Sequence, residues 1–452
     1  MNLVKLTFLW AILLSSITVA KPKSSAKLLD LQSIVFDKDL WEVKLADFRT
    51  KHQAHGFVYT SSSKKELRAT NNKFLFIDGP AGEVLIRSTN EKVSDVTISL
   101  FNRGDDKPIP FSSFNQRFNN LVTKISAKTG SKPSDISKSS TVDLKRKLWK
   151  WENSAILLES SYSTHRNKKT PEFIRIRMKP KNAKSRNIAN RSSLSSNVIK
   201  DRQSGDIYID NVPMIDQGQK GYCAVASAAR IYRYYGLDID QHELAQIAGT
   251  GANNGTSLGE MVSSLKKVTR HVKSRVLLLY EHPKGLADKD PSLSKSNQAW
   301  DRVIRNYNMG LKEFARDVKK YNKIAKKQGK KTFPDDYDTG VVNMQQFAME
   351  CDPSIYRDIM MKKSSFSRFN SKIKQYVDQG LPVGWCLQLG MFKEEGIPQT
   401  FGGHMRLIIG YNTKTKEIIY TDSWGAGHEK KRMPIADAFC MTTAILALPP
   451  TK

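Results

Sequence analysis

The amino-acid sequence predicts an α+β protein with two folded parts joined by a basic linker. The chain has 452 residues, which fits two domains better than one small module. Hydrophobic residues make up 39% of the chain, so a sizeable core can form. Strand-like runs and helical apolar spacings occur on both sides of the basic stretch, and this mixture indicates the α+β class.

The charge of the chain is strongly positive. There are 73 Lys and Arg residues against 44 Asp and Glu residues, which is a formal net charge of +29. Such a charge indicates anionic surroundings, for example envelope polymers, lipid head groups or nucleic acid. Only four Cys are present, which excludes a scaffold held together by disulfides.

Residues 1–20 have the pattern of a secretory signal peptide. Lys5 precedes the apolar run 6–14, and the small residues of Thr18-Val19-Ala20 supply a cleavage site. The run is shorter than the roughly 20 residues that a membrane span needs. We therefore expect cleavage, and a secreted or periplasmic protein with no transmembrane segment after it.

Residues 21–180 predict an α+β domain of unknown role. The spacing of apolar residues predicts a helix over 114–128 and a shorter helical segment over 39–48. Strand patterns occur at 57–60, 74–77, 84–87, 96–100, 155–158 and 173–178. The region contains no motif with evident chemistry, and its Trp149 and Trp151 are predicted to pack inward.

Residues 181–205 predict a basic flexible linker. Lys and Arg residues far outnumber the single acid, Asp201, and Ser and Asn fill much of the remainder. The stretch is either a simple tether or a processing site ahead of a C-terminal enzyme, because exposed basic linkers are easily cleaved. A polar helical insert is predicted further on, at about 292–331.

The chemistry lies in residues 206–452, where a cysteine begins a predicted helix. Gly218 and Gly221 precede Cys223, and small and apolar residues follow it as far as Gly236. A helix N-terminus favours an anion, so it lowers the pKa of a thiol and produces a reactive thiolate. A free Cys is more often a buried core residue, but the flanking residues favour a nucleophile here.

A base and an acid follow later in the chain. His404 begins an apolar strand after two glycines, and a second strand ends at Asp422. The short turn between them predicts an antiparallel hairpin, with His404 and Asp422 at the same end. The carboxylate can then hold the imidazole in the productive tautomer. His428 is an alternative base, but its charged turn predicts a solvated side chain.

These residues resemble those of the papain-like cysteine peptidase superfamily. Gln217 stands six positions before Cys223, as in the papain-like active-site segment. The tetrapeptide Asp422-Ser423-Trp424-Gly425 is similar to the Asn-Ser-Trp-Gly of that superfamily. Asp in place of Asn is typical of the C39-like branch, so the resemblance over about 206–450 points to that branch.

The resemblance implies a papain-like fold, in which the helix with Cys223 packs on an antiparallel sheet with His404 and Asp422. Cys223 would be the nucleophile, His404 the base and then the acid, and Asp422 the residue that orients the ring. Gln217 and the backbone N–H of Cys223 would form the oxyanion hole. The chain lacks the aromatic residues that follow the papain nucleophile and contains no transporter, so substrate specificity does not carry over.

The sequence therefore predicts an exported cysteine peptidase that acts on a peptide or protein substrate. No zinc-ligand spacing and no nucleotide-binding loop occur, so no cofactor or metal is expected. Two alternatives stay open. One is a transglutaminase- or amidase-type acyl transferase with the same triad. The other is a catalytically silent protein that binds an anionic polymer or envelope surface; no specific nucleic-acid binding is expected.

Overall fold

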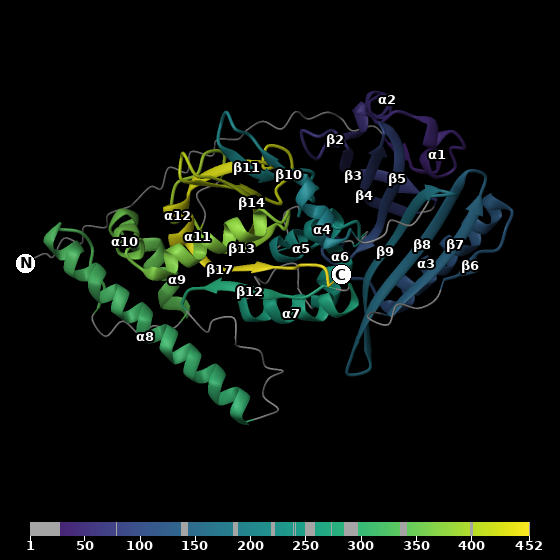
Figure 1. The fold of residues 1–452 in the computed structure, drawn as a ribbon. Helices are drawn as coiled ribbons and strands as arrows, with labels where there is room; N and C mark the ends of the chain where they lie inside the picture. The colour runs from purple at the N-terminus through teal and green to yellow at the C-terminus, as the bar shows by residue number, and fades with distance from the viewer. Residues whose placement is uncertain are drawn as a thin grey trace, which may run out of the picture.

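The computed structural model describes most of the chain after the predicted signal peptide. The described ranges are 28–77, 79–136, 143–183, 189–217, 222–237, 239, 241–248, 258–272, 274–283, 297–334, 341–397 and 401–451. Residues 1–20 lie outside them, and so do residues 184–188 of the predicted linker. Within these ranges the chain is mixed α and β, as predicted, with its strands in two largely antiparallel sheets (Figure 1).

The first sheet is formed by residues 28–183. Its strand order is β1-β3-β4-β5-β9-β8-β7-β6, with β2 paired to β3, and only the β1–β3 pair is parallel. The strands are β1 (Leu29–Asp30), β2 (Val58–Tyr59), β3 (Glu66–Phe76), β4 (Gly79–Thr89), β5 (Lys92–Asn102), β6 (Ser134–Asp135), β7 (Asp143–Trp151), β8 (Ser154–His165) and β9 (Lys168–Pro180).

Helix α3 (Phe111–Thr129) packs on this sheet against β7 and β9. Its buried residues Phe114, Phe118, Leu121 and Ile125 recur at helical spacing, which confirms the helix predicted for 114–128. Trp149 is buried below the helix, and its indole N–H donates to Ser126 Oγ at 3.2 Å. The shorter helices of this part are α1 (Gln32–Val35), η1 (Leu40–Glu42), α2 (Leu45–Lys51) and η2 (Gln53–His55).

The second sheet belongs to the C-terminal part of the chain. Its strand order is β10-β11-β14-β13-β17-β12, with β15 paired to both β14 and β16. The strands are β10 (Val198–Lys200), β11 (Asp206–Ile209), β12 (Leu277–Glu281), β13 (Val383–Leu389), β14 (Gly402–Asn412), β15 (Glu417–Thr421), β16 (Lys431–Pro434) and β17 (Thr442–Ala447).

Helices surround this second sheet. They are α5 (Cys223–Tyr234), α6 (Gln241–Ala248), α7 (Leu258–His271), α8 (Asn297–Lys327), α9 (Val341–Glu350), α10 (Pro353–Met360), α11 (Ser364–Val377) and α12 (Ile435–Met441). α8 lies at the outside of the molecule and confirms the predicted helical insert (Figure 1). No helix among the described residues is both long and apolar enough to cross a membrane.

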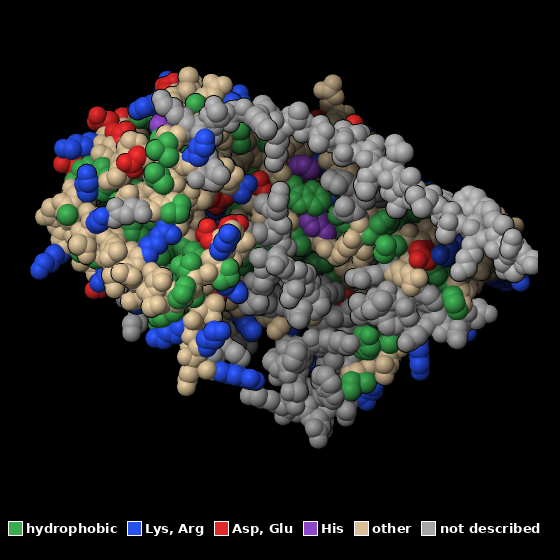
Figure 2. Space-filling model, turned by 180° about the vertical axis from the view of Figure 1, so that it is seen from behind, with side chains coloured by type: hydrophobic (Ala, Val, Ile, Leu, Met, Phe, Trp, Pro, Cys, Tyr) green, Lys and Arg blue, Asp and Glu red, His purple; other side chains and the backbone are tan. Residues whose placement is uncertain are grey.

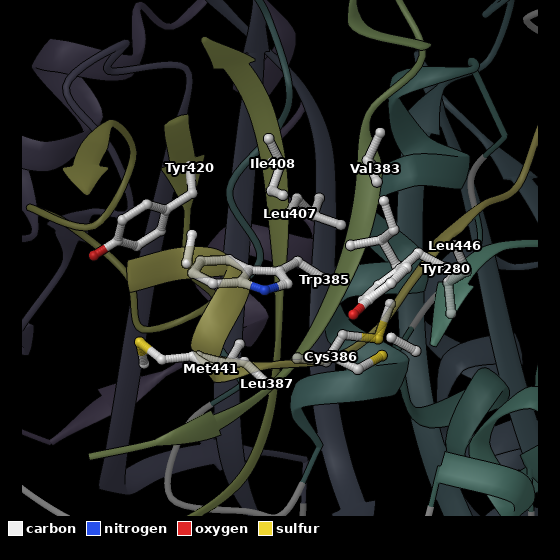
Figure 3. Close-up of a cluster of buried hydrophobic side chains, with 14 of the residues drawn as sticks. Tyr280, Val383, Trp385, Cys386, Leu387, Leu407, Ile408, Tyr420, Met441 and Leu446 are labelled. Carbon is white, nitrogen blue, oxygen red and sulfur yellow. The ribbon is translucent and has the colours of Figure 1, made fainter. Parts of the chain in front are cut away.

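Each part of the chain has its own hydrophobic core. In the C-terminal part, every residue of β13 is buried, so side chains on both faces of this strand are covered. Trp385 of β13 lies beside Tyr420 of β15 with ring centroids 5.5 Å apart, and Leu387 lies beside Met441 in this core (Figure 3). The buried centre of the sheet thus lies directly beside β14, the strand that carries His404.

The predicted flexible linker is wrong for residues 191–200. These residues form α4 (Arg191–Leu194), η3 (Ser195–Asn197) and β10, and β10 pairs antiparallel with β11. Leu194 is 1% exposed and belongs to the C-terminal core. Arg191 also donates to Gln379 Oε1 at 2.6 Å, and Asn197 donates to the Tyr234 hydroxyl at 3.0 Å, so the polar stretch is bound to the C-terminal part by apolar, strand and side-chain contacts.

Candidate active site

Cys223 is the first residue of α5, so its sulfur lies at a helix N-terminus. The small and apolar residues after it are buried, which lets the helix lie close to β14. The hydroxyl of Ser227 donates to the carbonyl of Met405 at 3.2 Å and ties helix and strand together. The Cys223 side chain also makes hydrogen bonds with the backbone of Ala224 and Met405.

His404 and Asp422 come together because β14 and β15 are antiparallel neighbours. The register pairs Leu407 with Thr421, so the residue after β15 lies beside the start of β14. His404 Nε2 donates to Asp422 Oδ1 at 2.8 Å. The His404 ring also makes a hydrogen bond with the Cys223 side chain. Since Nε2 is bound to the carboxylate, Nδ1 is the ring atom available to the sulfur.

The electrostatics of these three groups favour an ion pair of thiolate and imidazolium. Burial opposes the charged imidazolium, but the Asp422 carboxylate and its hydrogen bond raise the pKa of His404 to about 9. Burial likewise opposes the thiolate, but the hydrogen bond and charge of His404 bring the pKa of Cys223 below its ordinary value. A thiolate of this kind is a nucleophile at neutral pH.

Asp422 is fully buried and held by charged neighbours. Its Oδ2 accepts from Arg406 Nε at 2.6 Å, and its Oδ1 accepts from the backbone N–H of Ser423 at 2.8 Å. Burial disfavours the carboxylate, but the His404 charge outweighs it and lowers the pKa of Asp422 to about 2. Arg406 Nη1 donates in turn to Glu394 at 2.8 Å. The carboxylate is therefore ionised and fixed in orientation.

The sequence prediction missed Arg406 and a second buried arginine, Arg230. On α5, Arg230 donates to the carbonyls of Pro213 and Asp422, both at 2.8 Å, and to Thr421 Oγ1 at 2.5 Å. It thus joins the Cys223 helix to the strand end that carries Asp422. The available signal was a charged residue inside an otherwise apolar strand or small-residue helix, where an unpaired charge would be costly.

Trp424 covers the His404 ring. The two rings stack with centroids 4.6 Å apart and an interplanar angle of 21°. Trp424 also meets the ring of His428 edge-on with centroids 5.6 Å apart, and His428 is half-buried rather than solvated as predicted. Histidine and apolar side chains lie together in a hollow on the face shown in Figure 2. Such packing keeps water from the His404–Asp422 hydrogen bond.

Gln217 lies beside this group and is bound to the residue after Asp422. Its backbone N–H donates to the Ser423 carbonyl at 2.8 Å. Its side-chain oxygen accepts from Ser423 Oγ at 2.6 Å, so the side-chain NH₂ group points away from the Ser423 hydroxyl. Gly218 and Gly221, which the sequence analysis placed before Cys223, lie outside the described residues.

The remaining cysteines, Cys351, Cys386 and Cys440, are free and buried, and Cys223 is free as well. Burial raises the pKa of Cys351 to about 12, and it also raises the pKa of the Cys386 and Cys440 thiols. These three thiols are therefore unreactive, in contrast to Cys223. Within the described ranges, no cluster of His, Cys, Asp and Glu side chains is suited to a metal ion.

Comparison with known proteins identifies the C-terminal part of the chain. The family model described as Peptidase_C39 like family matches residues 209–310 and 292–443, which together span just over half of the chain. The matched residues include the four predicted site residues, Gln217, Cys223, His404 and Asp422. No curated protein matches the chain.

Proposed function

The chain belongs to the Peptidase_C39 like family, and from this premise we propose that it is a cysteine peptidase that cleaves peptide bonds through Cys223. The observation that carries the proposal is the series of hydrogen bonds from the Cys223 side chain through His404 to Asp422. Residues 206–452 are the proposed catalytic domain. The α4–β10 segment belongs to the same unit, because β10 pairs with β11, the first strand of this domain.

In the proposed reaction, the Cys223 thiolate attacks the carbonyl carbon of the scissile bond. The negative charge that develops on the carbonyl oxygen is stabilised by the backbone N–H of Cys223 and the amide of Gln217. The His404 imidazolium gives its proton to the leaving amine, and a thioester on Cys223 remains. Neutral His404 then takes a proton from water, which attacks the thioester and releases the acid.

Asp422 holds the ring in place during both proton transfers. Its carboxylate accepts from Nε2, which leaves Nδ1 to exchange the proton with sulfur, leaving group and water. After His404 itself, Arg406 adds to the charge that keeps the carboxylate ionised, through its 2.6 Å contact with Oδ2. Trp424 adds a ring face that favours the imidazolium, because the π-system attracts a cation.

The replacement Cys223→Ala tests the proposal. We expect it to abolish turnover of a peptide mixture and labelling by a thiol-directed acyl-enzyme probe. Cys351→Ala is the matched control, because it removes a buried thiol with a raised pKa, and it should retain both signals. Unchanged cleavage by the Cys223 variant would refute the proposal. Cross-linked product with an added amine, but no hydrolysis, would make the enzyme an acyl transferase.

We also propose that the protein works outside the cytoplasm and near anionic material. The support is the signal-like pattern of residues 1–20 and the net charge of +29. Fractionation of cells that express the full chain should place a shortened protein outside the cytoplasm. Affinity for an anionic polymer should fall steeply with added salt, whereas a salt-independent result would remove charge as the cause.

A further inference from the structure

A salt bridge joins the first sheet to the residue that precedes Gln217. Arg68 on β3 contacts Asp216 Oδ2 through Nη1 at 2.6 Å and Glu83 Oε1 through Nε at 2.6 Å. The Arg68 and Asp216 side chains are 20% and 23% exposed, so solvent only partly screens the pair. The N-terminal part therefore reaches a position one peptide bond from the proposed oxyanion-hole residue.

Asp216 is held on three sides. Besides its salt bridge to Arg68, its carbonyl accepts from Gln241 Nε2 at 3.2 Å. Its carboxylate lies against Gly425, where an added Cβ would be 3.1 Å from Oδ2. Since the next residue, Gln217, is bound to Ser423 through backbone and side chain, fixing Asp216 also fixes how Gln217 lies in the site.

Two further contacts from the first sheet reach the ends of the Cys223 helix. Glu66 Oε2 lies 3.2 Å from Arg233 Nη1, near the end of α5. At the other end, Asn102 makes a 3.0 Å hydrogen bond with the ring of His242. That ring packs edge-on against Tyr222, the residue before Cys223, with centroids 5.9 Å apart.

The turn after Asp422 is also bound to the N-terminal part. The backbone N–H of Ser62 donates to Glu429 Oε1 at 2.7 Å, and Glu429 Oε2 accepts from the backbone of Gly427 at 2.8 Å. The first sheet also contacts α6, where Ser161 donates to Gln246 at 2.6 Å, but the contacts described above fall on segments that flank the proposed catalytic residues. Contacts at these positions hold the segments that carry the proposed catalytic residues in fixed positions.

We propose that the N-terminal part is a permanent component of the active site, in which Arg68 is a positioning residue that acts on Gln217 through Asp216. The proposal rests on the proposed peptidase function of the C-terminal part. It opposes an inhibitory pro-segment, whose separation from the enzyme would raise the rate. Loss of the Arg68 contact instead lowers the rate, because the amide of Gln217 no longer meets the developing oxyanion in one fixed position.

The test compares Arg68→Met with Arg103→Met in the full-length protein. Arg103 is a matched control, because its 2.8 Å ion pair with Glu172 lies entirely within the N-terminal part. Three quantities are measured: hydrogen exchange at the backbone N–H of Gln217, kcat and KM for peptide turnover, and the rate of Cys223 alkylation. The first and third quantities do not depend on peptidase activity.

For Arg68→Met we expect amide exchange at Gln217 to rise about tenfold and kcat to fall about tenfold, the order of one lost charge-assisted hydrogen bond. KM and the alkylation rate should stay within about twofold, because the thiolate and its base are not altered. Arg68→Lys should recover part of kcat by keeping the charge. Arg103→Met should match the wild type in all three measurements.

Exchange and kcat equal to those of Arg103→Met would overturn the positioning role, and a higher kcat in Arg68→Met would indicate inhibition by the N-terminal part. If the wild type turns over no peptide, the peptidase proposal fails, while exchange at Gln217 still decides whether Arg68 positions it. Should Arg68→Met not fold, Asp216→Asn breaks the same salt bridge from the other side and must give the same pattern.

Discussion

Replacing Asp422 with Asn should remove the charge that keeps the His404 ring protonated. The side chains of His404 and Asp422 are 6% and 0% exposed, so the interaction is little screened by solvent. The pKa of His404 is raised from 6.5 to about 9 even though burial acts in the opposite direction. At 1.36 kcal/mol per pKa unit, the net stabilisation of the imidazolium is about 3 kcal/mol.

Asn cannot restore the contacts of the carboxylate. Asp422 Oδ1 accepts from His404 and Oδ2 accepts from Arg406 Nε at 2.6 Å, whereas Asn offers one oxygen and one NH₂ group. If the Asn oxygen stays with Arg406, the NH₂ group faces Nε2, which can accept from it only when the ring is neutral; if the oxygen stays with His404, the NH₂ group faces the Arg406 donor. We expect the pKa of His404 to fall to its ordinary value or below, so that the thiolate–imidazolium pair of Cys223 is no longer favoured at neutral pH.

The assay is the rate of Cys223 alkylation by iodoacetamide as a function of pH. In Asp422→Asn the half-point of the thiolate curve should rise, because His404 no longer carries the charge that lowers the pKa of Cys223, and the rate at neutral pH should fall. Asp437→Asn is the control, because it breaks a similar 2.8 Å contact with Arg357 away from the site. A curve for Asp422→Asn that coincides with the wild-type curve would refute this account of the electrostatics.

The other predictions concern the oxyanion hole, the segment before the second sheet and the dependence of stability on pH. Gln217→Ala should lower kcat by roughly 10²–10³-fold while the alkylation rate of Cys223 stays unchanged, and equal kcat values would exclude Gln217 from the oxyanion hole. Gly380→Ala should lower the free energy of unfolding by more than about 1 kcal/mol in urea titrations. Gly380 has a φ of +70°, and an added Cβ would lie 2.0 Å from the carbonyl oxygen of Leu194, the last residue of α4. An unchanged urea midpoint would mean that α4 does not pack against Gly380. In a Cys223→Ala background, which removes the opposing titration of the thiol, the stability contributed by the His404 imidazolium should be fully present below pH 6.5 and be lost as pH rises through the pKa of His404, which the retained Asp422 carboxylate still raises. The melting temperature of Cys223→Ala should therefore fall more steeply over this interval than that of the double variant that also carries His404→Gln. Equal slopes for the two variants would contradict the raised pKa of His404.

Much of the candidate site could be predicted from local patterns. A helix that begins at Cys223 follows from the run of small residues after it, and the β14–β15 hairpin follows from two apolar strands around a short turn. The hairpin alone places His404 and Asp422 near each other, because antiparallel register brings the ends of its strands together. These features depend on neighbours within a few tens of residues.

Contacts between distant segments could not be predicted. Arg230 meets Asp422 from 192 positions away in the chain, and Arg68 meets Asp216 across 148. A sequence shows that such an arginine is present, but the partner depends on which surfaces pack together. The linker prediction failed for the same reason, since Leu194 becomes a core residue only when the second sheet provides a place for it.

The sequence by itself determined the chemical groups of the candidate site, their order along the chain and the local elements that carry them. Helix starts, turns and strand alternation are set by short-range backbone and side-chain preferences, which one sequence displays. Only the tertiary structure decided that Arg406 and Arg230 surround Asp422 and that the first sheet holds the segment before Gln217. Burial removes water from these charged groups, so their pKa values and their pairing depend on the complete packed environment.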